Sequence, residues 1–234
     1  LNNMSIIDIS FTLPMLAGLI LVLFFGKSSS TRTIIGRVTA VWLCLYTTAS
    51  FGLKYQADAY FEKQLKAQGI TPTRMMTAPT LSNILLWRML AESGDHYHIA
   101  YWSVLDAPQR TCRIDSTPKG HQSLEPIKQK PEAAQLIWFT KSWHKVIADP
   151  QEKNSMLLVD MRFTEMVTPE RKSPIFTWKL TQQDDQVDFN QVSFREKSKA
   201  GETLDYLWQR IQGKAPEWMA GSWPWHEEDI PQSQ

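Results

Sequence analysis

The feature that most constrains this chain is an uncharged stretch at residues 9–26, close to its N-terminus. A transmembrane helix needs about 17–25 predominantly apolar residues, so this stretch is long enough to cross a bilayer. A second stretch, residues 33–53, carries one charge, Arg37, near its start, where a long side chain can reach the headgroups. Residues 1–54 are therefore predicted to form a transmembrane helical hairpin, with spans at about 9–26 and 33–53.

Two other interpretations of these stretches stay open. A secretory signal peptide would need a basic n-region and a small-x-small cleavage site, and residues 1–32 offer neither. The two stretches could also be buried core helices of a soluble domain. Two successive hydrophobic runs of this length with a single charge are unusual in such a domain. Leu1 in place of an initiator Met also suggests that the chain is the downstream part of a longer protein.

The charges around the two stretches predict their orientation. Lys27, Arg32 and Arg37 lie in the connector at residues 26–37, whereas Asp8 is the only charge before it. The positive-inside rule makes this connector cytoplasmic. In a bacterium, the chain would then belong to the inner membrane, and everything after Leu53 would face the periplasm.

Composition narrows the class of protein and its partners. The 234 residues include 25 Lys and Arg against 24 Asp and Glu, and this balance argues against a nucleic-acid binder. A content of 43% hydrophobic residues excludes a disordered chain. The two cysteines, Cys44 and Cys112, fall in the second span and in the soluble part, so no intradomain disulfide is expected. The expected partners are membrane lipid and a protein that the sequence does not identify, with no nucleic acid.

Residues 55–217 are predicted to form an extracytoplasmic α+β domain. Apolar spacing predicts helices over 55–68, 131–141 and 201–212, the first continuing out of the membrane. Three β-hairpins are predicted, and the first strand of the first hairpin could also be a short helix. An extended segment at 71–79 and a strand at 111–115 are predicted as well. The expected architecture is a mostly antiparallel sheet with helices packed on one face. The hairpins are expected at 83–92 with 97–106, 143–148 with 156–163, and 175–180 with 187–194.

The last residues, 218–234, form a Trp-rich acidic tail. Trp218, Trp223 and Trp225 lie close together in it. Indole rings serve packing in most folded chains, and they also favour the headgroup level of a membrane. The tail is therefore either a lid over the domain core or an anchor at the bilayer surface.

Five residues are candidates for a polar cluster in the soluble part: Trp87, Arg88, Asp106, Asp160 and Arg162. Asp160 and Arg162 alternate with apolar residues, so they share one strand face and could pair with each other, or with Arg88 and Asp106. Such a cluster is either an ion-pair network that fixes strand register or a pocket for an anionic group.

Metal-binding and catalytic motifs are sparse. His96 and His98, at i and i+2 on a predicted strand, point to one side and are weak metal candidates, since no third ligand stands at a diagnostic spacing. An exposed polar hairpin tip is the alternative. The sequence has no P-loop, Gly-x-Ser-x-Gly, Gly-x-Gly-x-x-Gly or Cys-x-x-Cys, so its catalytic residues are unknown.

Four segments carry a resemblance that covers most of residues 5–180: 8–25 (DISFTLPMLAGLILVLFF), 78–88 (APTLSNILLWR), 97–106 (YHIAYWSVLD) and 158–163 (LVDMRF). Together they resemble the C-terminal half of the membrane-bound metal-dependent hydrolases, also called LexA-binding, inner-membrane-associated hydrolases. The resemblance implies a divalent metal, held in the N-terminal membrane part by a His-Arg-Gly-x-Thr-His motif and acidic residues. This chain lacks that motif, so no catalytic residue carries over and the ligands would lie upstream of Leu1.

Two hypotheses about function follow. In the first, the chain is the membrane-anchored C-terminal portion of an inner-membrane metal-dependent hydrolase. Its five polar-cluster residues would then recognise substrate or support the structure. In the second, it is a non-catalytic membrane-anchored domain that binds a partner or a lipid-like ligand on the outer face.

Overall fold

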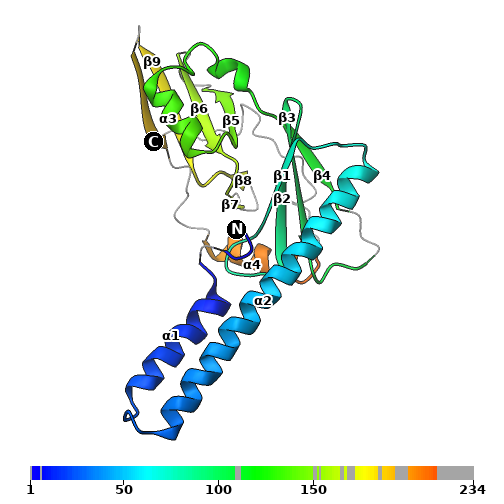
Figure 1. Ribbon diagram of the computed structural model, residues 1–234. Coiled ribbons are helices and arrows are strands. Elements are labelled where there is room, and N and C mark those ends of the chain that lie inside the picture. The colour runs from blue at the N-terminus through cyan, green and yellow to red at the C-terminus, as the bar shows by residue number, and fades with distance from the viewer. Residues whose placement is uncertain are drawn as a thin grey trace.

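The computed structural model describes residues 2–5, 7–108, 112–149, 152, 154–163, 166–167, 172–183, 186–192 and 200–214. In these residues a helical hairpin projects from an α+β domain (Figure 1). The α+β class and the mostly antiparallel pairing are as predicted. The Trp-rich tail at 218–234, and the predicted end of the domain at 217, lie outside the described residues.

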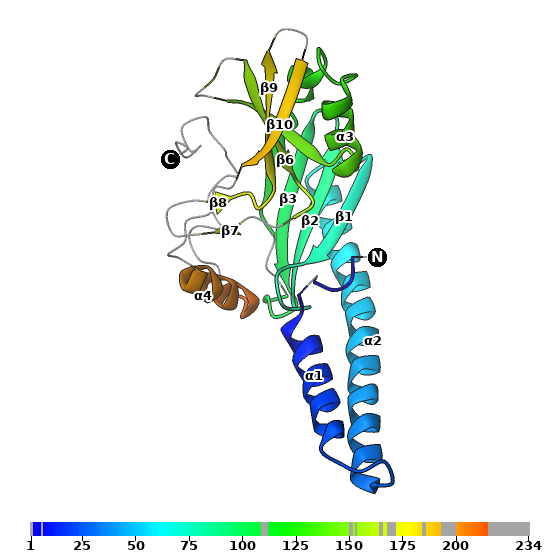
Figure 2. The same cartoon turned by 90° about the vertical axis from the view of Figure 1, so that its left-hand side faces the viewer.

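The hairpin consists of α1 (Ile9–Leu23) and α2 (Ser30–Ala67). Asp8 is the N-cap of α1: its carboxylate accepts a hydrogen bond from the Phe11 N–H at 3.3 Å and so satisfies a donor of the first turn. Helix α2 has 38 residues, about 57 Å at 1.5 Å per residue. Its first part runs beside α1 and its last part lies along the domain (Figure 2). The predicted helix at 55–68 is therefore the unbroken continuation of the predicted second span.

The prediction of two full transmembrane helices is confirmed only in part. Among the described residues, α2 is the one helix long and apolar enough to cross a membrane, and α1 is a shorter apolar helix. The 15 residues of α1 extend about 22 Å, less than the roughly 30 Å of a hydrocarbon core. The physical reason is the tight reversal after Leu23. The Phe24 N–H bonds to the Leu21 carbonyl at 3.1 Å, and the Ser29 N–H bonds to the Gly26 carbonyl at 2.9 Å, so the end of the uncharged stretch forms a turn.

The two helices make their tightest contact at Gly18 of α1. Gly18 is buried, and a Cβ built on it would overlap the Thr39 hydroxyl and lie 2.8 Å from Thr39 Cγ2. Small residues let helix backbones approach closely in this way. Near the other end of the pair, the Trp42 indole N–H donates to the Ser10 carbonyl at 3.1 Å. The hairpin is therefore a packed pair whose spacing depends on Gly18.

We expect Gly18→Ala to weaken the helix pair by about 1–3 kcal/mol, the usual cost of overpacking a close contact. Gly36→Ala is the matched control, because Gly36 is also helical but has open space where its Cβ would lie. The measurement is the free energy of unfolding of the full chain in detergent, titrated with SDS and followed by circular dichroism. Equal stabilities of the two variants would contradict the close contact.

The first sheet has four antiparallel strands in the order β1-β2-β3-β4. Its centre is the predicted hairpin of β2 and β3, in which Leu86 pairs with Ser103 and Ser93 with His96. The first arm is thus a strand and not a helix, and it begins at Leu86, after the connection that follows Pro79. The predicted extended segment at 71–79 becomes an edge strand. The strands are β1 (Arg74–Pro79), β2 (Leu86–Ser93), β3 (His96–Ser103) and β4 (Ile114–Pro118).

The second sheet has four antiparallel strands in the order β10-β9-β6-β5. The two other predicted hairpins form it and join through β6 and β9, where Ser155 pairs with Thr181. Its strands are β5 (His144–Ala148), β6 (Ser155–Asp160), β9 (Thr177–Gln183) and β10 (Gln186–Val192). The other described elements are the 3₁₀ helix η1 (His121–Leu124), α3 (Pro131–Phe139), the short pair β7 (Met166–Val167) and β8 (Lys172–Ser173), and α4 (Ala200–Ile211).

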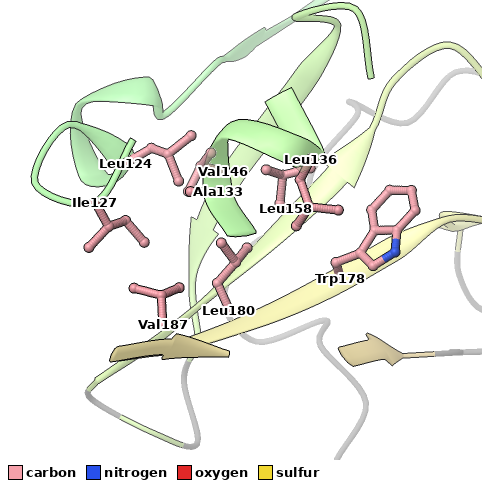
Figure 3. Packing of buried hydrophobic residues seen from close by; sticks show 9 residues of the cluster. All are labelled: Leu124, Ile127, Ala133, Leu136, Val146, Leu158, Trp178, Leu180 and Val187. Atoms are coloured by element: carbon pink, nitrogen blue, oxygen red, sulfur yellow. The ribbon is translucent and has the colours of Figure 1, made fainter. Parts of the chain in front are cut away.

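Three apolar clusters show how these elements are layered. Side chains of both sheets meet in one cluster, for example Leu90 and Ile99 with Val159 and Met161. The opposite face of the first sheet packs on α2, and the opposite face of the second packs on α3 (Figure 3). The prediction of one sheet with helices on one face is therefore wrong: two sheets lie face to face, with a helix outside each. Strands β2 and β6 are buried along most of their length because both of their faces are covered.

Candidate functional site

The predicted polar residue Asp106 lies in an ion pair with a residue outside the five candidates. Both carboxylate oxygens accept from Arg210 of α4, at 2.6 and 2.7 Å, and one of them also accepts from the Ser103 N–H. The two side chains are only 3% and 5% exposed. Arg210 also donates to the Tyr101 carbonyl at 3.1 Å. This fork-shaped pair fixes α4 against the end of β3.

Asp160 and Arg162 form a second pair. The Arg162 guanidinium donates to both carboxylate oxygens of Asp160, at 2.6–3.1 Å, and the Arg162 backbone N–H adds a bond of 3.0 Å. Arg88 reaches the same turn from the other sheet, because its Nη1 donates to the Met161 carbonyl at 2.9 Å. Tyr101, whose carbonyl accepts from Arg210, is the cross-strand neighbour of Arg88.

The structure thus brings Arg88, Asp160 and Arg162 to one turn, whereas Asp106 and Trp87 have other partners. Trp87 is on the opposite face of β2, in the cluster with α2, and its indole N–H donates to the Ile84 carbonyl at 2.9 Å. Asp106 pairs with Arg210 instead of Arg162 or Arg88. Arg210 was missed because its partner is 104 positions away, although it stands between Leu207 and Ile211 on the inner side of an amphipathic helix.

A second polar group between the sheets was also missed. Glu92 accepts from Arg74 and from Lys119, the latter at 2.5 Å, and the Arg74 guanidinium stacks 3.9 Å from the Trp143 ring centre. Burial would raise the pKa of Glu92, but the hydrogen bonds from Lys119 and Arg74 outweigh it and hold this pKa below its usual value. Arg74 also donates to the carbonyls of Lys141 and Ser142. The group ties β1, β2 and the turn after α3 together.

Two buried titratable side chains lie on neighbouring positions of β5. Burial, with a contribution from the nearby His121, lowers the pKa of His144 to about 3. The His144 and His121 rings stack at 4.4 Å, and His144 Nδ1 lies 3.0 Å from the Thr140 hydroxyl. Burial also lowers the pKa of Lys145 to about 8, and its ammonium donates to Thr117 Oγ1 at 2.6 Å. His144 is thus neutral at pH 7.

The Lys145 shift predicts a stability effect in alkali. The folded pKa of about 8 lies below the ordinary 10.5, so the unfolded chain holds the proton more tightly and stability rises between these two pH values. The rise amounts to about 3 kcal/mol. We expect Lys145→Met to be more stable than the wild type at pH 7 by roughly 2 kcal/mol, after loss of one hydrogen bond.

Urea unfolding of the full chain in detergent at pH 7, 9 and 10.5 measures this difference, which should shrink to zero near pH 9.5 and reverse by about 1 kcal/mol at pH 10.5. Lys63→Met, at an exposed position of α2, is the control and should change no pH dependence. A Lys145→Met advantage that stays constant with pH would contradict the shift.

The weak metal candidates do not complete a site in the part of the chain that the structure describes. His98 Nδ1 lies 2.7 Å from the Ser116 hydroxyl, and burial together with the nearby His96 lowers its pKa. No group of three or more His, Cys, Asp or Glu side chains with metal-binding geometry occurs among the described residues. The divalent metal implied by the resemblance therefore has no ligand set within them.

The surface of α3 presents a shallow hollow. It is lined mainly by residues from the helix and the turn that follows, and Trp138 beside it is 78% exposed. Lys141 and Ser142 in that turn have φ values of 51° and 57°, the left-handed region that non-glycine residues seldom adopt. Arg74 and Tyr97 hold the turn through hydrogen bonds to its carbonyls.

Comparison of the chain with protein-family models, with curated proteins and with solved structures finds no significant match. The class that the fold defines is an α+β domain of two packed antiparallel sheets, joined to an apolar helical hairpin.

Proposed function

We propose that the chain is a membrane-anchored, non-catalytic binding domain, held by the α1–α2 hairpin. The observation that carries the proposal is the outer surface of the hairpin, where large apolar side chains are exposed along both helices. Apolar patches of this extent mark a membrane or a partner surface. The exposed side chains include Leu13, Leu16, Leu19, Ile20, Leu23, Phe24, Ile34, Val38, Val41 and Leu45.

The proposed location is the bacterial inner membrane, with the domain in the periplasm. Lys27 and Arg32 lie at the far tip of the hairpin and Arg37 lies two turns into α2, and the positive-inside rule assigns this end to the cytoplasm. Lys54 marks the other end of the apolar part of α2, and it bonds to Asp58 and to the Thr77 hydroxyl of the domain. The apolar segment between Arg32 and Lys54 matches the bilayer in length. Helix α1 would fill less of the bilayer depth.

The non-catalytic role is supported by the charged candidate residues, which form contacts within the fold. Asp106 joins β3 to α4 through Arg210, Arg88 joins the first sheet to the second through the Met161 carbonyl, and Asp160 pairs with Arg162 in the turn after β6. Ion pairs used in this way set register and hold elements in place. Under this proposal a partner meets the outer surface of the domain, and the buried polar groups serve the fold.

Membrane flotation tests the anchor. The wild-type chain should float with lipid vesicles after alkaline carbonate treatment, whereas Leu19→Lys/Leu45→Lys should stay at the bottom of the gradient, because two exposed apolar positions of the hairpin become charged. Trp138→Lys is the control, since Trp138 is exposed on α3 at the far end of the domain (Figure 1), and it should float. A wild-type chain that washes off in carbonate would overturn the anchor.

The hydrolase hypothesis remains the second candidate, and one observation favours it. The segments that resemble the membrane-bound metal-dependent hydrolases come together in space. The Ser82 hydroxyl donates to the Ile7 carbonyl next to α1, and Arg88 contacts Met161 in the segment 158–163. In this proposal the domain supports a metal centre supplied by helices upstream of Leu1. The genomic sequence before Leu1 tests it: a His-Arg-Gly-x-Thr-His motif would support the proposal, and its absence would refute it.

A further inference from the structure

Helix α4 lies at the end of the domain from which the hairpin projects. Both views place it beside the point where α1 and α2 meet the domain, and its axis runs across the direction of α2 (Figures 1 and 2). Two contacts fix it there: the Arg210–Asp106 ion pair and a hydrogen bond of 2.6 Å from the Ser103 hydroxyl to the Ile211 carbonyl. Its position is thus set by buried contacts with β3.

One stripe of α4 stays exposed although it is apolar. Leu204 and Trp208, one turn apart, are 57% and 58% exposed, whereas Arg210 and Ile211 on the inner side are buried. Asp205 and Gln209 form a separate polar strip and bond to each other at 2.7 Å. An isolated domain in water gains nothing by placing a Leu and a Trp together on the outside of an amphipathic helix.

Further exposed apolar residues lie at the same end of the domain. Leu81 is next to Ser82, which bonds to the segment just before α1, and Leu105 lies against Gly213 at the end of α4. Both side chains are about half exposed, as is Ile7. The apolar surface of the hairpin therefore continues onto the base of the domain, across three separate parts of the chain.

We propose that this base, formed by α4 with Leu81 and Leu105, rests on the bilayer surface as a second lipid contact. The inference depends on the proposed hairpin anchor, which brings the base to the headgroup level. An amphipathic helix that lies in the interface buries an apolar face by several ångströms, and Trp favours this depth. Arg210 is in an ion pair and Asp205 is exposed, so insertion relies on apolar contact and not on attraction to anionic lipids.

Spin labels test this depth. In a Cys44→Ala/Cys112→Ala background, the full chain carries one nitroxide at Trp208→Cys, at Leu204→Cys or at the control Trp138→Cys, and is placed in phosphatidylcholine nanodiscs. The ratio of collision with oxygen to collision with a water-soluble nickel complex should be several-fold higher at 204 and 208 than at 138. Adding phosphatidylglycerol should leave the ratios unchanged. Equal ratios at all three sites, or burial only with the anionic lipid, would overturn the inference.

Flotation of the same labelled proteins separates the two proposals. If they float with vesicles and the label at 208 is in water, the hairpin anchor stands and the lipid contact of α4 is refuted. If they do not float, the anchor itself fails and the contact fails with it. Circular dichroism of each labelled protein verifies that the exposed substitutions leave the fold intact.

Discussion

Acid should destabilise the domain through His144. Burial and the nearby His121 lower the folded pKa of His144 to about 3, whereas its ordinary value is 6.5. Below pH 6.5 the unfolded chain therefore takes up a proton that the folded chain refuses, and stability falls as the pH falls. Protonation linked to His144 alone should lower the free energy of unfolding by about 2 kcal/mol at pH 5 and by about 5 kcal/mol at pH 3.

The variant His144→Asn isolates the effect, because an amide can donate to the Thr140 hydroxyl and does not titrate. Urea unfolding of the full chain in detergent, repeated between pH 7 and 4, gives the free energy of unfolding of each protein. The wild type should lose its advantage over His144→Asn as the pH drops, and His96→Asn, at an exposed position, should follow the wild type. If the free energies of unfolding of wild type and His144→Asn change with pH in parallel, His144 is not held neutral.

Removal of Arg210 should cost about 3–5 kcal/mol, the usual result of leaving one buried ion without its partner. In Arg210→Met the Asp106 carboxylate keeps the Ser103 N–H but loses both guanidinium bonds, and the side chain is only 3% exposed. The Tyr101 carbonyl loses a donor as well. The same change should loosen α4 from β3, which the spin label at 208 would report as greater mobility.

Arg113→Met is the matched control, because the Arg113–Asp115 pair is half exposed on its arginine side. Exposed pairs contribute about 0–1 kcal/mol, so this change should be nearly neutral. The double variant Asp106→Leu/Arg210→Met should recover most of the stability, because no buried charge is left unpaired. Urea unfolding midpoints of the three variants measure these changes in stability. If Arg210→Met and Arg113→Met lose the same stability, the buried ion pair does not stabilise the domain.

Local patterns predicted most of the elements. The apolar spacing of α3 and α4 and the turn around Gly94 were sufficient for two helices and the β2–β3 hairpin, because these signals act over a few residues. The two-sheet arrangement was not predicted. Alternation in β9 shows that the strand is half buried, but it does not say whether a helix or another sheet covers it.

The candidate site was predicted only where its partners are close in sequence. Asp160 and Arg162 are two positions apart, and their alternation was enough to expect a shared face. Arg210 meets Asp106, and Lys119 meets Glu92, across 104 and 27 positions. Such pairs depend on how the sheets pack, which no local pattern contains. The reversal at 24–29 was missed for a different reason, since apolar residues there look helical until the turn is formed.

A dual topology reporter is the most direct test of the central claim, a hairpin-anchored domain outside the cytoplasm. The full chain is expressed in a bacterium with alkaline phosphatase and green fluorescent protein in tandem at its C-terminus; the phosphatase works only in the periplasm, and the fluorescent protein matures only in the cytoplasm. We expect high phosphatase activity and little fluorescence, with the fusion in the membrane fraction. Bright fluorescence without phosphatase activity, or a fusion in the soluble fraction, would contradict it.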